Sequence, residues 1–123
     1  MTPAVLVVDD EADFLATYDR LLRRQGYRTI TASTRQAALA APEGESFALI
    51  ISDLRLSDGD GLDVVRAARA RLEPPPVIVV TGFASAQSRR QALAAGATAY
   101  LAKPFSTSAL TSLVREALAP PST

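Results

Sequence analysis

The sequence has no cysteine and no histidine among its 123 residues. Without cysteine the chain has no disulfide framework, no thiolate zinc site and no thiol nucleophile. Without histidine it lacks an imidazole base and the usual ligand for transition metals. Covalent chemistry is therefore left to a carboxylate, a hydroxyl or the single lysine, Lys103.

The sequence also lacks an excess of charge and any long apolar run. Lys plus Arg and Asp plus Glu number 13 each, so the chain has no net positive charge that would attract it to nucleic acid or to an anionic membrane. No apolar run approaches the roughly 20 residues of a membrane helix. Met1-Thr2-Pro3 leads into a short apolar run followed by acids, which is not the pattern of a signal peptide. We expect a cytoplasmic protein that does not itself bind nucleic acid or a membrane.

Three short runs are almost purely apolar and rich in β-branched residues: 5–8, 48–51 and 77–80. Strands without apolar and polar alternation are typically buried on both faces, as in a parallel sheet covered by helices. Two weaker strands are predicted at 27–31 and 98–101. The hydrophobic content of 48% is sufficient for the core of one domain.

Helical patterns separate these strands. The first apolar face lies in residues 14–22 and is predicted to end at Gly26, a typical C′ residue. A second face, from Leu62 to Leu72, precedes three prolines at 74–76, and a third lies in residues 110–118. Residues 35–41 and 87–95 are alanine-rich and predict shorter helices, the latter with Leu93 as its only large apolar anchor and therefore weakly packed.

The resulting order is βαβαβαβαβα, which predicts an α/β fold with a doubly wound parallel sheet of five strands and five helices. Ligands bind such sheets at the carboxyl ends of the strands. The polar residues at those ends are Asp9, Asp10 and Glu11 after the first strand, Asp53 after the third, Thr81 after the fourth and Lys103 after the fifth. Any one of them alone could be a helix cap or a solvated loop residue, but their convergence on one edge favours a functional site.

This set of side chains indicates phosphoryl chemistry. Crowded carboxylates repel one another unless a cation bridges them, and carboxylates without imidazole or thiolate select a hard ion such as Mg²⁺. The ammonium of Lys103 and the hydroxyl of Thr81 suit phosphate oxygens. Asp53 is the candidate nucleophile because it stands alone at the central strand end.

The sequence resembles the receiver domains of two-component response regulators over nearly its whole length, from Ala4 to about Leu118. The motifs that carry the resemblance are Val-Val-Asp-Asp-Glu at 7–11, Ser-Asp-Leu-Arg-Leu at 52–56, Asp-Gly-Leu at 60–62, Val-Thr-Gly at 80–82 and Tyr-Leu-Ala-Lys-Pro-Phe at 100–105. The resemblance implies a flavodoxin-like sheet with strand order 2-1-3-4-5, a receiver domain at 1–118, and a tail or the start of a linker at 119–123.

The resemblance also implies roles for individual residues. Asp53 is the expected phosphoacceptor, with Lys103 and Thr81 contacting the phosphoryl group. The expected Mg²⁺ ligands are Asp10, Asp53, the backbone carbonyl of Arg55 and, largely through water, Asp9. Tyr100 is the expected aromatic switch, which turns inward when Thr81 moves, and the Lys103-Pro104 bond is expected to be cis.

The implied activity is a switch rather than a turnover enzyme, although the domain would catalyse its own phosphorylation and dephosphorylation. The expected donor is the phosphohistidine of a sensor histidine kinase or a histidine phosphotransfer protein, because this chain has no histidine of its own. The expected readout face is 84–118, which would contact an output domain or a second copy of the chain.

The chain departs from the family pattern after the phosphoacceptor, where Ser57 and Gly59 replace the usual proline and large apolar residue. A looser loop at 57–61, with extra negative charge near the metal, is the expected result. Two alternatives stay open: a degenerate receiver that only binds proteins, and a phosphatase in which Asp9 is the nucleophile and Glu11 the second acid. A flavin- or nucleotide-binding module lacks support, because no glycine-rich loop follows the first strand.

Overall fold

The computed structural model describes residues 4–41 and 47–118. Its elements, in chain order, are β1 (Ala4–Val8), α1 (Ala12–Arg24), β2 (Arg28–Ala32), α2 (Arg35–Leu39), β3 (Phe47–Asp53), β4 (Arg55–Leu56), β5 (Gly59–Asp60), α3 (Leu62–Arg69), β6 (Val77–Thr81), α4 (Ala86–Ala95), β7 (Ala99–Ala102) and α5 (Thr107–Leu118). Five strands form one sheet in the order β2-β1-β3-β6-β7, with every neighbouring pair parallel. The predicted order 2-1-3-4-5 is confirmed, since β6 and β7 are the fourth and fifth strands of that prediction.

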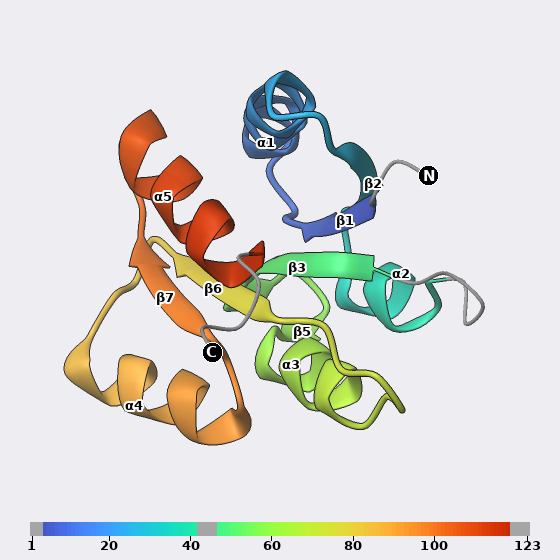
Figure 1. The fold of residues 1–123 in the computed structure, drawn as a ribbon. Helices are drawn as coiled ribbons and strands as arrows, with labels where there is room; N and C mark the ends of the chain where they lie inside the picture. Colours follow the sequence, from blue (N-terminus) through green and yellow to red (C-terminus); the bar gives the residue numbers. More distant parts are fainter. Residues whose placement is uncertain (1–3, 42–46, 119–123) are drawn as a thin grey trace, which may run out of the picture.

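Helices cover both faces of this sheet. Figure 1 shows α1 and α5 on one side and α2, α3 and α4 on the other. Successive residues of a strand point to opposite faces, so Val5 and Val7 pack with α1 and α5, whereas Leu6 and Val8 pack with the other three helices. Burial on both faces explains why β1, β3 and β6 are apolar at nearly every position.

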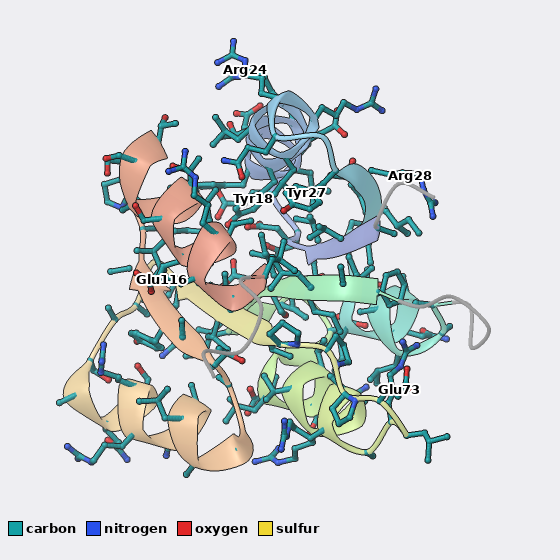
Figure 2. The ribbon with its side chains drawn as sticks, viewed as in Figure 1. Tyr18, Arg24, Tyr27, Arg28, Glu73 and Glu116 are labelled. Carbon is teal, nitrogen blue, oxygen red and sulfur yellow. The ribbon has the colours of Figure 1, made fainter. Side chains whose placement is uncertain are left out.

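Helix α1 shows how the apolar periodicity becomes packing. Tyr18, Leu21 and Leu22 are buried against the sheet. Tyr18 points from α1 into the space above the sheet, whereas Arg24 projects outward from the far side of the same helix (Figure 2). Gly26 follows the helix with a φ of 90°, a conformation that glycine adopts without steric cost, as its predicted C′ role requires.

The structure corrects two predictions about apolar anchors. Helix α3 ends at Arg69, so Leu72 lies beyond it and is fully exposed. The physical reason is Pro74, whose ring in a continued helix would clash with the carbonyl of residue 70. Leu93, the expected anchor of α4, is 40% exposed, and Ala92 is the residue of that helix that is buried in the core.

A short antiparallel hairpin, β4 with β5, was not predicted. It lies between the end of β3 and the start of α3, in the segment that departs from the family pattern. Across 4–41 and 47–118, no helix has both the length and the apolar character needed to cross a bilayer. The predicted tail or linker at 119–123 lies outside the described residues.

Candidate functional site

Four carboxylates meet at the carboxyl ends of β1 and β3. Asp9, Asp10, Glu11 and Asp53 each place an oxygen within 4.8 Å of the others. Asp9 is completely buried and Asp53 is 7% exposed, whereas Asp10 and Glu11 are exposed. The parallel sheet produces this cluster, because β1 and β3 are neighbours and end at the same edge. The predicted convergence of Asp9, Asp10 and Asp53 is therefore observed, and Glu11 joins them.

Lys103 provides the positive charge of the site. Its Nζ donates hydrogen bonds to Asp9 Oδ2 at 2.8 Å and to Asp53 Oδ2 at 2.9 Å, and it lies 3.5 Å from Glu11 Oε1. Its side chain is only 6% exposed although the loop is at the surface. The Lys103-Pro104 bond is cis, as expected. The backbone N–H of Lys103 donates to the carbonyl of Thr81 at 2.8 Å, which fixes this loop to the end of β6.

The pKa values follow from burial and from these ion pairs. Burial raises the pKa of Asp9, and the hydrogen bonds from Lys103 and from the backbone of Glu11 only partly oppose that effect. Burial alone would lower the pKa of Lys103. Its hydrogen bonds to Asp9 and Asp53 outweigh burial, so the pKa of Lys103 is raised and the ammonium stays charged.

A cavity of about 370 Å³ opens over the cluster. Asp10, Glu11, Asp53 and Lys103 line it from below, and Arg55, Leu56, Ser57, Gly82 and Phe83 line its rim. The Arg55 guanidinium lies over the Phe83 ring, 4.4 Å from its centroid, and both residues line the cavity. Asp9 does not line the cavity, because it lies beneath Lys103 and has no exposed surface.

Thr81 and Tyr100 lie beside the cluster on β6 and β7 rather than within it. Thr81 is buried, and its Oγ1 accepts a hydrogen bond from the backbone N–H of Phe83 at 3.0 Å. The Tyr100 hydroxyl contacts the Ser88 hydroxyl and accepts from the backbone N–H of Ser85 at 3.3 Å. Tyr100 is thus tied to the N-terminal turn of α4, whose capping box consists of Ser85 and Ser88.

The loop at 57–61 is organised differently from the expectation. The Asp58 carboxylate accepts from the backbone N–H groups of Arg35 and Gln36, at 2.7 and 2.9 Å, and so caps the first turn of α2. These hydrogen bonds lower the pKa of Asp58. The expected extra charge therefore does not join the carboxylate cluster: Asp58 is directed to α2, and Asp60 accepts from Leu62 N–H at 2.8 Å.

Two glycines let this loop approach its neighbours. A Cβ on Gly61 would lie 2.0 Å from the Asp53 carbonyl oxygen, so only glycine brings the start of α3 so close to the candidate nucleophile. Gly59 has a φ of 152°, and a Cβ there would lie 2.5 Å from the Arg35 side chain. Arg35 crosses this position to pair with Asp63 of α3 at 2.8 Å. Gly59, one of the two departures from the family pattern, thereby lies against Arg35 of α2, whereas Ser57 lines the cavity.

Sequence reasoning missed two contributors to the site. Glu11 was noted after the first strand but was not assigned to the metal site, although its adjacency to Asp10 was a usable signal. Phe14 was assigned only to a helical face, yet its ring centroid lies 3.9 Å from Lys103 Nζ. No sequence pattern links two residues so far apart in the chain. The backbone N–H of Arg55 donates to Asp53 Oδ1 at 3.2 Å, while the Arg55 carbonyl as a metal ligand stays a prediction.

The donor set fits a hard divalent cation. It consists of carboxylate oxygens from two adjoining strand ends, with no nitrogen or sulfur ligand. The cavity leaves space beside these oxygens, and the Lys103 ammonium adds a positive charge in direct contact with Asp9 and Asp53. A fixed ammonium beside a nucleophilic carboxylate suits transfer of an anionic group.

The sequence matches a known protein family over most of its length. The family model of the response regulator receiver domain matches residues 5–115. The photosynthetic apparatus regulatory protein RegA of Rhodobacter capsulatus is 36% identical over 121 residues, which cover 96% of this chain and 66% of RegA. The transcriptional regulatory protein PrrA of Mycobacterium tuberculosis is 38% identical over 117 residues, covering 95% of this chain and 50% of PrrA.

A solved structure shows the same fold. The CheY-like response regulator receiver domain protein of Methanospirillum hungatei superposes with a TM-score of 0.87 at 33% identity, covering 96% of this chain and 94% of that one. The chain thus spans nearly all of a single receiver domain, but just under two thirds of RegA and half of PrrA.

Proposed function

We propose, from the premise that this chain belongs to the response regulator receiver domain family, that Asp53 accepts a phosphoryl group and that the resulting charge switches the α4–β7–α5 face. The observation that carries the proposal is the position of Asp53. It is the buried carboxylate that lines the cavity, and its Oδ2 is 2.9 Å from the Lys103 ammonium.

The reaction is transfer from a phosphohistidine in trans. A carboxylate oxygen of Asp53 attacks phosphorus, an O–P bond forms, and the P–N bond breaks with its electron pair returning to the imidazole of the donor. The product is a mixed anhydride on Asp53. Attack of water on the same phosphorus releases inorganic phosphate and restores the carboxylate. The ammonium of Lys103, which pairs with Asp53, would neutralise charge on the phosphoryl oxygens in both steps.

A Mg²⁺ ion fits the proposed site. Asp10 and Asp53 would hold it directly, Asp9 largely through water, and the Arg55 carbonyl would complete the protein ligands. The ion would supply charge neutralisation for the carboxylates and the phosphoryl oxygens. Glu11 is close enough to the other acids to act on the same ion, which extends the ligand set expected from the sequence.

The switch is proposed to work through Thr81 and Tyr100. A phosphoryl group on Asp53 adds acceptor oxygens beside the end of β6, and these recruit the hydroxyl of Thr81. Movement of Thr81 makes room for Tyr100, which then leaves its hydrogen bonds to Ser85 and Ser88 at the start of α4. A local change of charge is thereby coupled to the face of α4, β7 and α5.

The proposed partners follow from the same chemistry. The donor is a sensor histidine kinase or a histidine phosphotransfer protein, and the proposed location is the cytoplasm. RegA, PrrA and similar relatives are named as regulatory proteins and are longer than this chain. An output domain or a second copy of the chain is the proposed partner of the 84–118 face.

The phosphatase alternative is disfavoured by burial. It requires Asp9 as the nucleophile, but Asp9 has no exposed surface and lies under Lys103, where a substrate cannot reach it. Asp53 alone of the two buried acids faces the cavity. The degenerate-receiver alternative makes a different prediction, namely that no covalent adduct forms.

The test is phosphorylation by acetyl phosphate with Mg²⁺, followed by intact mass measurement. We expect a gain of one phosphoryl group in the wild-type protein and complete loss of the adduct in Asp53→Asn. The matched control is Asp13→Asn, because Asp13 is an exposed carboxylate on the first turn of α1 outside the cluster, and it should form the adduct normally. Release of phosphate without an adduct would favour a phosphatase, and an unmodified, unreactive wild-type protein would favour the binding module.

A further inference from the structure

Lys103 contacts both carboxylates and an aromatic ring. Its Nζ is 2.8 Å from Asp9, 2.9 Å from Asp53 and 3.5 Å from Glu11, and it lies 3.9 Å from the centroid of the Phe14 ring. A cation within about 6 Å of a ring centroid is attracted by the negative face of the ring. The attraction is strongest where water is excluded, and this side chain is only 6% exposed.

The Phe14 ring is itself held in place by two other rings. Its centroid is 6.0 Å from that of Phe105 and 6.3 Å from that of Tyr18, and Tyr18 stacks on Phe105 at 5.7 Å. Tyr18 is buried, and Phe105 follows Lys103 by two residues in the same loop. The three rings connect α1 to the loop that carries the ammonium, so the position of Phe14 is determined by packing on both sides.

The ring and the carboxylates act on the ammonium in different ways. Each carboxylate contact uses an N–H donor, whereas an aromatic face attracts the charge without being a strong acceptor. A lysine side chain has a flexible four-carbon stem, and its ammonium moves readily to the strongest acceptor. The carboxylates of Asp9 and Glu11 therefore compete with an incoming phosphoryl oxygen, but the ring does not.

We propose that Phe14 is a positioning residue that holds the Lys103 ammonium toward Asp53 through a cation–π contact and leaves its donors free for the phosphoryl group. The inference rests on the proposed function of Asp53. Phosphorylation replaces the carboxylate that now binds Lys103 by an acyl phosphate, and the ring keeps the ammonium in place through this change. Asp9 and Glu11, which are not phosphorylated, would otherwise draw it away.

The single lysine makes the contact directly measurable. In protein grown with isotope-labelled lysine, the side-chain signals belong to Lys103 alone. We expect the ring to shift the ε-methylene protons of the wild-type protein, and the shift to disappear in Phe14→Leu, which retains an apolar side chain without a π face. Phe14→Tyr should restore the shift. With acetyl phosphate and Mg²⁺, Phe14→Leu should be phosphorylated roughly threefold to tenfold more slowly, and Phe14→Tyr close to the wild-type rate.

A second variant separates positioning from loosened packing. Leu15→Ala removes apolar contact from the same helix without touching the ammonium, so it should lower stability but leave the Lys103 signals and the phosphorylation rate unchanged. A wild-type rate in Phe14→Leu, or an equal loss in Leu15→Ala, would overturn the inference. Failure of the wild-type protein to form an adduct would instead refute the proposed function, and an unshifted Lys103 signal in that protein would refute the ring contact separately.

Discussion

Helices α1 and α4 lie on opposite faces of the sheet, and each is next to a different part of the proposed site. Helix α1 buries Tyr18, Leu21 and Leu22, and it carries the ring that contacts Lys103. Helix α4 buries only Ala92 among its ten residues and contacts Tyr100 through neutral hydroxyl groups. One helix therefore combines large apolar side chains with a contact to the charged cluster, and the other combines small side chains with a contact to Tyr100.

The difference shows that the two sides of one small domain can be anchored to different degrees. Ion pairs and closely packed large side chains lose much of their interaction energy when they are displaced even slightly, so the α1 side resists displacement. Small side chains and exposed hydrogen bonds cost little to rearrange, as expected of an element at the low-stability end of a fold. A change of charge at Asp53 would thus be transmitted toward α4 rather than toward α1.

The largest expected effect comes from truncating one leucine in each helix, which tests whether α1 is anchored more strongly than α4. Leu22→Ala removes a side chain that is 1% exposed and should lower the free energy of unfolding by about 2–5 kcal/mol. Leu93→Ala removes a side chain that is 40% exposed and should change it by no more than about 0.5 kcal/mol. Urea unfolding of both variants measures the contrast, and similar losses in the two helices would refute the difference in anchoring.

A second experiment sharpens the comparison by removing charge on the α1 side. Because burial raises the pKa of Asp9, the ionised carboxylate is unfavourable in the folded protein. Asp9→Asn should therefore increase the free energy of unfolding at pH 7, by on the order of 1 kcal/mol. The urea unfolding is measured without divalent ions, because a bound cation would stabilise the ionised Asp9 carboxylate in the wild-type protein.

The sign of the pH dependence provides the control. A raised pKa means that the folded wild-type protein keeps the Asp9 proton up to a higher pH than the unfolded chain does. In the unfolded chain the pKa of Asp9 is near 3.8. The Asn variant should have its full advantage above the raised pKa, and the advantage should decline as the pH falls toward 3.8. An advantage that grows on acidification would contradict this explanation.

The last experiment tests the contact between Tyr100 and the start of α4. Ser88→Ala removes the hydroxyl that contacts Tyr100 and half of the capping box of α4, so we expect a loss of about 0.5–1 kcal/mol. The ring signals of Tyr100 should also show greater averaging in NMR spectra. Ser112→Ala, an exposed serine of α5, is the matched control. Unchanged Tyr100 signals in Ser88→Ala would show that Ser88 does not restrain the tyrosine.

Much of the fold could be predicted because strands that are buried on both faces are apolar at consecutive positions of the sequence. The apolar runs at 5–8, 48–51 and 77–80 all became inner strands of the parallel sheet. Leu72 and Leu93 were misplaced because apolar periodicity marks a candidate face without specifying where a helix ends or how closely it packs. Pro74 decided the first case, and the close approach of Ala92 to the core decided the second.

By itself, the sequence determined which reactive side chains are available and at which edge of the sheet they lie. Absence of cysteine and histidine left acids, hydroxyls and one lysine, and parallel strands end at one edge, so Asp9, Asp10, Asp53 and Lys103 had to converge. Only the tertiary structure decided which acid lies beneath the ammonium, that the Phe14 ring contacts it, and that the Asp58 side chain is directed to α2. These contacts join residues distant in the chain, and their geometry depends on packing that no local pattern encodes.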